Sequence, residues 1–126
     1  MRKDSPHADK KSITINDLKG CPLIIPRQPN HNTMISDLLE KKAPDANIVA
    51  EINLVYNASV MVKEGMGYAL TLDRLINVSG DSEMCFVPLK PGMDAVCRFV
   101  WKRYPIFTKA AEKFLGQFLE DMEKFR

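Results

Sequence analysis

The chain has 126 residues, of which 45% are hydrophobic and 27% are charged. These values suit one globular domain, or one lobe of a larger domain, with an apolar core. The formal net charge of +2 gives no electrostatic case for binding of nucleic acid or a membrane by this chain alone. No stretch reaches the ~18 consecutive apolar residues of a membrane span, and no apolar stretch follows the basic start to make a secretory signal.

The cysteine pattern indicates a reducing compartment. The chain has three cysteines, Cys21, Cys85 and Cys97, which is an odd count, and no two of them have CxxC spacing. We therefore expect free, buried thiols in a cytoplasmic protein. With only His7 and His31 besides, the sequence predicts no zinc site, and it carries no cofactor motif.

The first third of the chain predicts a turn, a strand and a helix. Asn16 is expected to cap a short helical turn that Gly20 ends in a left-handed conformation. The apolar run 22–26 predicts a strand that is buried on both faces, as in a parallel sheet. After a polar loop, Asn32 is expected to cap a helix that continues to Lys42.

The middle of the chain continues this alternation. Strands are expected over 48–56 and 68–72, with a helix between them that Asn57 opens and residues 65–67 end. The glycines of 65–67 do not favour dinucleotide binding, because the third glycine of that motif is missing and they follow a helix instead of opening one. Another strand is expected over 84–89.

The last third predicts a strand and the clearest helix of the sequence. Residues 95–102 carry apolar side chains on both faces, which is typical of a strand inside a sheet. Between Phe107 and Phe125, apolar residues recur at steps of three and four, so we expect an amphipathic helix opened by Thr108, with its Phe cluster in a core. Alternating strands and helices predict an α/β fold, with a mostly parallel sheet flanked by helices.

Several stretches occur in a fixed order over nearly the whole chain. They are SITINDLKGCPLI at 12–24, VMVKEGMGYAL at 60–70, VPL at 87–89, CRFVWKR at 97–103 and AAEKFL at 110–115. Together they resemble the carboxy-terminal part of the effector-binding domain of LysR-type transcriptional regulators. The resemblance implies a fold like that of type II periplasmic binding proteins, with a small effector in the cleft between two α/β lobes.

The same resemblance implies how the domain is organised and what it does. Residues 1–94 would form the second lobe, and residues 95–126 would return to the first lobe. The winged helix-turn-helix would be absent from this chain, so that DNA is bound only through that missing amino-terminal domain of a homo-oligomer. Effector binding would shift lobe closure and so modulate transcription, without catalysis and without a membrane. A stand-alone solute-binding lobe of the same fold is the alternative.

Candidate site residues follow from the strand ends. In open α/β sheets, ligands collect at the carboxyl ends of strands, beside helix amino-termini. Arg27 follows the 22–26 strand, and its guanidinium fits a carboxylate with two hydrogen bonds. The alternatives are a solvated loop arginine and, for Asn57, a plain N-cap. The resemblance adds the turn at 67–69, which the family uses to line its cleft. The expected effector-binding residues are therefore Pro26, Arg27, Gln28, Asn57, Gly67, Tyr68 and Ala69.

Catalytic and redox interpretations have less support. His31 as a general base would need a positioned nucleophile, and the nearest serines, Ser36 and Ser59, lack a nucleophile-elbow context. A redox-sensing Cys21 would need a second, suitably placed thiol. We therefore expect no catalytic residues and no enzyme.

Overall fold

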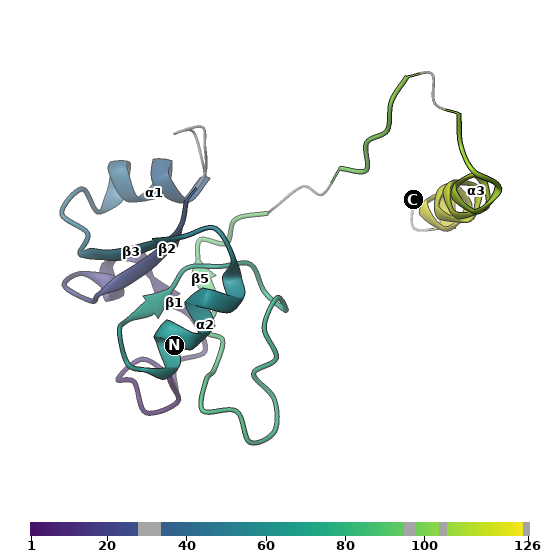
Figure 1. The fold of residues 1–126 in the computed structure, drawn as a ribbon. Coiled ribbons are helices and arrows are strands. Elements are labelled where there is room, and N and C mark those ends of the chain that lie inside the picture. The colour runs from purple at the N-terminus through teal and green to yellow at the C-terminus, as the bar shows by residue number, and fades with distance from the viewer. Residues whose placement is uncertain (28–33, 95–97, 104–105, 125–126) are drawn as a thin grey trace. The chain divides into compact units, whose positions relative to one another are not determined.

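The computed structural model describes residues 1–27, 34–94, 98–103 and 106–124 (Figure 1). The chain divides into two compact units, Met1–Ala95 and Val96–Arg126.

The centre of the first unit is a parallel sheet of three strands, in the order β3-β2-β4. β2 (Leu23–Pro26) pairs with β3 (Ile48–Ile52) on one side and with β4 (Tyr68–Ala69) on the other. β2 lies in the middle of the sheet, so its apolar run is buried on both faces, as the sequence predicted. The α/β fold class with a parallel sheet is confirmed.

Two helices cover the opposite faces of this sheet (Figure 1). Leu23 and Ile25 pack with Leu39 of α1 (Met34–Lys42). Ile24, whose side chain points to the other face, packs with Ala58 and Val62 of α2 (Val55–Lys63). Burying one aliphatic side chain of this size stabilises a fold by about 1.5–3 kcal/mol. The alternation of side chains along β2 therefore holds both helices in place.

A second, smaller sheet joins distant parts of the same unit. β1 (Ile13–Thr14) pairs in parallel with β5 (Leu89–Lys90). Further towards the start, Arg2 forms an antiparallel bridge with Met84. The N–H of Lys3 donates to the carbonyl of Glu83 at 2.8 Å. The amino-terminal segment is thus bound along the segment that precedes β5.

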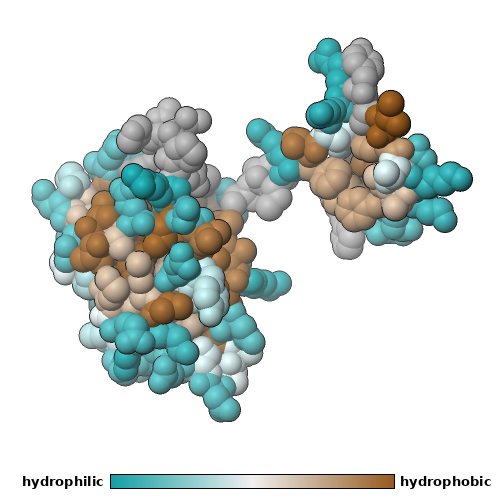
Figure 2. Space-filling model, in the orientation of Figure 1, coloured by the Kyte–Doolittle hydropathy of each residue, from teal (hydrophilic) through white to brown (hydrophobic). Residues whose placement is uncertain are grey.

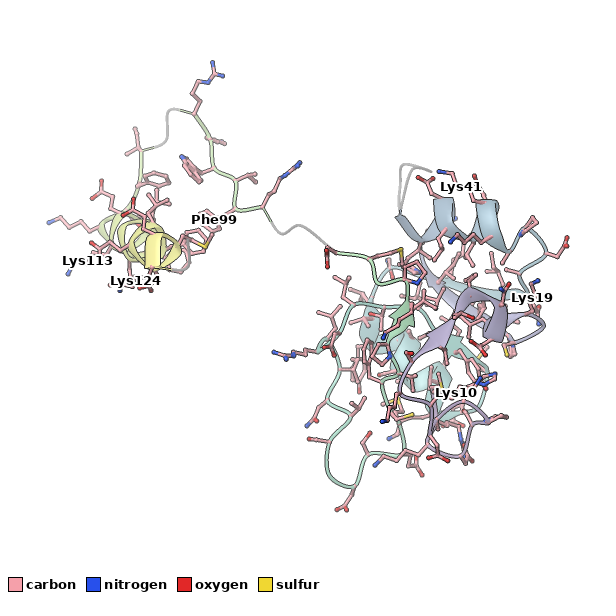
Figure 3. All side chains as sticks on the ribbon, turned by 180° about the vertical axis from the view of Figure 1, so that it is seen from behind. Lys10, Lys19, Lys41, Phe99, Lys113 and Lys124 are labelled. Atoms are coloured by element: carbon pink, nitrogen blue, oxygen red, sulfur yellow. The ribbon has the colours of Figure 1, made fainter. Side chains whose placement is uncertain are left out.

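The second unit is built around α3 (Lys109–Lys124). The hydroxyl of Thr108 accepts a hydrogen bond from the N–H of Ala111 at 3.3 Å, which confirms Thr108 at the helix start. Figure 3 shows Phe99 lying against this helix, and its ring centroid lies 4.8 Å from that of Phe118. No described residue of α3 is buried, so the aromatic cluster is half-exposed, which differs from the core that we expected.

The cap predicted at Asn16 is wrong. The turn is a 3-10 helix, η1 (Ile15–Leu18), and its N-cap is Thr14, because the Asp17 carboxylate accepts bonds from both the backbone N–H and the hydroxyl of Thr14 at 2.7 Å. Gly20 does adopt the predicted left-handed conformation, with φ of 76°. Asn32 lies outside the described residues.

Two of the predicted strands are shorter than expected. The strand predicted over 48–56 ends at Ile52, because Val55 already belongs to α2 and lies on the same helix face as Ala58 and Val62. Asn57 is therefore the third residue of α2 and not its cap. The strand predicted over 68–72 ends at Ala69. Pro26 of β2 has no N–H with which to extend that ladder.

The strand predicted over 84–89 is interrupted. Met84 makes only the bridge to Arg2, and regular pairing resumes at Leu89. Pro88 between them has no N–H to donate, although its carbonyl accepts from Ile13 at 2.9 Å. These residues are therefore two short pairings in place of one strand.

The strand predicted over 95–102 is not present in its described part. Residues 98–102 form no regular secondary structure, and residues 95–97 are not described. A strand needs a neighbour that shares its N–H and C=O groups. Within the described part of the second unit, Phe99 packs against α3 instead.

The described thiols are free, as the sequence predicted, but they are less buried than expected. Cys21 and Cys85 are free and half-buried, and Cys97 lies outside the described residues.

Apolar surface (brown) is interspersed with polar surface on the viewed side of the first unit (Figure 2). Across the described ranges, no helix combines enough length with enough apolar character to span a bilayer. Nor do those ranges bring together three or more side chains suited to hold a metal ion.

Candidate functional site

The carboxyl ends of β2 and β3 meet at one edge of the central sheet, which we call the carboxyl edge. Pro26 is the partner of Ile52 at the ends of these strands. The ladder continues for one more bond, because the N–H of Arg27 donates to the carbonyl of Ile52 at 2.6 Å. The backbone of Arg27 is therefore held by β3, while its side chain extends beyond the sheet.

Arg27 has the most exposed charged side chain of this edge. Its side chain is 76% exposed, and its Nε lies 3.6 Å from Oε2 of Glu51 on β3. That separation exceeds the 2.7–2.9 Å of a charge-assisted hydrogen bond. Among the residues that the structure describes, this long contact with Glu51 leaves most of the five guanidinium donors for another acceptor.

The first turn of α2 adds helix N–H groups at the same edge. α2 begins shortly after β3 ends, and its N-cap residue Leu54 supplies no side-chain bond to the turn. The exposed Asn57 and Tyr56 both lie in this turn. An uncapped helix amino-terminus carries partial positive charge and favours an anion.

Tyr68 and its neighbours lie further back along the sheet. Tyr68 pairs with Leu23, the first residue of β2, so it lies towards the amino ends of the strands. Its ring meets that of His7 edge-on, with centroids 6.1 Å apart, and burial raises the pKa of its phenol. Gly67 is buried against Pro22, and Ala69 packs on the α2 side of the sheet.

The structure therefore divides the predicted site residues into two groups. Pro26, Arg27 and Asn57 lie at the carboxyl edge, whereas Gly67 and Tyr68 lie near the opposite end of the sheet. Gln28 and His31 lie outside the described residues.

Two residues of this edge were not among the sequence-based candidates. They are Glu51, which neighbours Arg27, and Tyr56, which is 70% exposed in the first turn of α2. Glu51 is the one charged residue in the apolar segment 48–52, and that contrast is a signal that the sequence offered. Tyr56 gives no such signal, because the sequence pattern predicts it at the end of a strand.

A hollow of about 320 Å³ lies elsewhere, between η1 and the end of α1. Leu18, Leu23 and Lys42 are among its lining residues. Leu23 begins β2, so this hollow lies at the amino end of the sheet. None of the candidate site residues lines it.

A parallel sheet with helices on both faces, and polar side chains where its strands end, defines an open α/β domain of the ligand-binding kind. A family model described as the LysR substrate binding domain matches residues 1–123, and the chain belongs to this family. Its fold is accordingly that of type II periplasmic binding proteins.

A solved structure agrees with this assignment at the level of the fold. The crystal structure of HinK, a LysR family transcriptional regulator from Pseudomonas aeruginosa, matches with a TM-score of 0.68 and 20% sequence identity. The match covers 100% of this chain and 44% of HinK, so the chain spans less than half the length of that regulator. No curated protein sequence matches the chain.

Proposed function

We propose that this chain is the effector-sensing part of a LysR-type transcriptional regulator and binds a small carboxylate at the carboxyl edge. The family assignment supports the sensing role. In this proposal effector binding modulates DNA binding by the full-length protein, through a winged helix-turn-helix outside residues 1–126. The chain would bind and release its ligand without chemical change, in the cytoplasm.

The observation that carries the carboxylate proposal is the placement of Arg27. Its backbone is held by β3, its guanidinium is exposed, and the uncapped first turn of α2 begins at the same edge. A guanidinium binds a carboxylate with two parallel hydrogen bonds, and a helix amino-terminus adds to the attraction. Both features favour the same ligand chemistry.

The remaining site residues receive roles by their positions. Pro26 and Asn57 would contact the ligand beside Arg27, and Gln28 stays in the proposal because it follows Arg27 in the chain. Gly67, Tyr68 and Ala69 remain in the proposed set because the family uses this turn to line its cleft, although β4 pairs with the first residues of β2 and not with its carboxyl end. Residues 1–94 are proposed as the second lobe and residues 95–126 as part of the first.

We also propose that the regulator works as a homo-oligomer. β3 is an edge strand of the sheet, and its Ile48 and Val49 are exposed. An exposed edge strand with apolar side chains favours pairing with another surface. Sedimentation of the full-length protein as a strict monomer at high concentration would contradict this part.

The test of the ligand proposal is thermal-shift and calorimetric screening of acetate, succinate and benzoate against the full-length protein and Arg27→Ala. Losing a two-bond charged contact is expected to weaken binding roughly 10- to 100-fold. Lys19→Ala is the matched control, because it removes one positive charge beside the hollow at the other end of the sheet. Binding that survives Arg27→Ala but is lost in Lys19→Ala would place the ligand in that hollow.

The alternative function, a stand-alone solute-binding lobe, predicts a different coding sequence upstream of this chain. A helix-turn-helix encoded upstream in the same reading frame supports the regulator. An upstream secretory signal in its place would support the solute-binding lobe.

A further inference from the structure

Glu51 is an acidic neighbour of Arg27 whose position follows from the sheet itself. Ile25 on β2 is the partner of Glu51 on β3. Ile25 packs on the α1 side of the sheet, and Arg27, two residues later, emerges on the same side.

Glu51 emerges on that side as well. Its neighbours Ala50 and Ile52 pack with α2 on the other face, so the alternation of the strand turns Glu51 towards α1. The register of β2 and β3 thus brings the side chains of Arg27 and Glu51 close together at the carboxyl edge.

The contact between Arg27 and Glu51 is weak enough for a ligand to displace it, and Glu51 is close enough to repel a carboxylate bound to Arg27. Arg27 Nε and Glu51 Oε2 are 3.6 Å apart, and the side chains are 76% and 53% exposed. Exposed pairs of this kind contribute little to stability. Yet a carboxylate bound on the guanidinium would lie within one Debye length of the Glu51 charge, which is about 8 Å at physiological salt.

We infer that Glu51 is a specificity-determining residue that limits how much negative charge the Arg27 site accepts. This inference rests on the proposed carboxylate function. With Glu51 in place, the pair is neutral, and a bound carboxylate must overcome repulsion from Glu51. A ligand with a second carboxylate is repelled more strongly, so Glu51 favours monocarboxylates over dicarboxylates.

The test compares acetate and succinate binding to the full-length protein and to Glu51→Gln, by titration calorimetry and by the NMR shift of the Arg27 Nε–H. Glu51→Gln is expected to raise acetate affinity about 2- to 5-fold, the range for one exposed ion pair. Succinate should gain more than acetate. The gain should shrink as salt is raised, because screening removes the repulsion.

Two further variants separate the charge of Glu51 from its shape. Glu51→Asp keeps the charge and should bind both probes like the natural protein. Glu40→Gln removes an exposed carboxylate from α1 and should leave both affinities unchanged. Equal gains in Glu51→Gln and Glu40→Gln would reduce the effect to net charge and overturn the inference.

Failure of this inference is distinguishable from failure of the proposed function. If Arg27→Ala weakens binding while Glu51→Gln changes neither affinity, the site stands and the role of Glu51 is wrong. If Arg27→Ala changes nothing, the carboxylate site itself is wrong. If neither acetate nor succinate binds the natural protein or Glu51→Gln, the proposed carboxylate site and the role of Glu51 are both wrong. Glu51→Gln removes the charge that neutralises Arg27, so a carboxylate site at Arg27 should bind at least one probe in that variant.

Discussion

Gly67 lies directly against the backbone of Pro22: a Cβ added to Gly67 would come within 2.4 Å of the Pro22 carbonyl oxygen. That carbonyl accepts the hydrogen bond from the N–H of Tyr68 at 2.8 Å. Only a residue without a side chain lets β4 approach the start of β2 this closely. The glycine thus serves sheet assembly at the amino end of β2, away from the carboxyl edge.

Gly67→Ala is therefore expected to destabilise the first unit. Backbone has to move to admit the methyl group, and overpacking of this kind costs about 1–3 kcal/mol. Urea unfolding followed by circular dichroism would measure the loss. Gly92→Ala is the control, because its nearest atom, the Leu89 carbonyl oxygen, is 4.0 Å away. Equal stability of the two variants would contradict the close approach.

The fold was predictable where one physical signal dominated. The apolar run around Ile24 predicted a strand buried on both faces, and the spacing of Phe114 and Phe118 predicted α3. The strand ends were not predictable, because their causes lie outside the apolar pattern of the strand itself. Pro26 ends the pairing of β2 with β4 by lacking an N–H, and Val55 leaves the strand pattern because its side chain joins a helix face.

The candidate site was predictable in part for the same reason. Arg27 could be found because it directly follows an evident strand. Glu51 could not be connected to it, since their proximity depends on the register of β2 and β3. The strand expected around Phe99 is missing from the described residues, because a strand depends on a neighbour that local pattern does not reveal.

The aromatic cluster of the second unit leads to a second prediction. The Phe99 ring lies 4.8 Å from Phe118 and 5.8 Å from both Phe114 and Trp101, centroid to centroid. Each such pair contributes about 0.5–1.5 kcal/mol beyond its area burial. Phe99→Ala in the full chain is expected to shift Trp101 fluorescence to the red and to lower the helicity of α3.

The control for that prediction is the adjacent Val100→Ala. Val100 is 80% exposed, so its truncation should change neither fluorescence nor helicity. If Phe99→Ala gives the same spectra as the natural chain, the packing of Phe99 on α3 is wrong.

Asp17 leads to a prediction about acid stability. Lys10 Nζ lies 2.6 Å from Asp17 Oδ1, and Thr14 donates from its N–H and its hydroxyl to Oδ2. The hydrogen bond from Lys10, followed by those from Thr14, holds the pKa of the Asp17 carboxyl well below its usual range. A lowered pKa means that the ionised carboxylate stabilises the folded state above the unfolded value of about 4.

That contribution is lost as the pH falls below about 4 towards the folded-state pKa, because the unfolded chain then binds a proton that the folded chain resists. Asp17→Asn should therefore unfold at lower urea concentration than the natural protein at pH 7, and the difference should narrow at pH 3. Asp9→Asn, which removes an exposed carboxylate from the same segment, should change the midpoint little at either pH. The urea midpoints of Asp17→Asn and the natural protein could differ as much at pH 3 as at pH 7. That result would show that the ionised carboxylate contributes nothing to the closure of this turn.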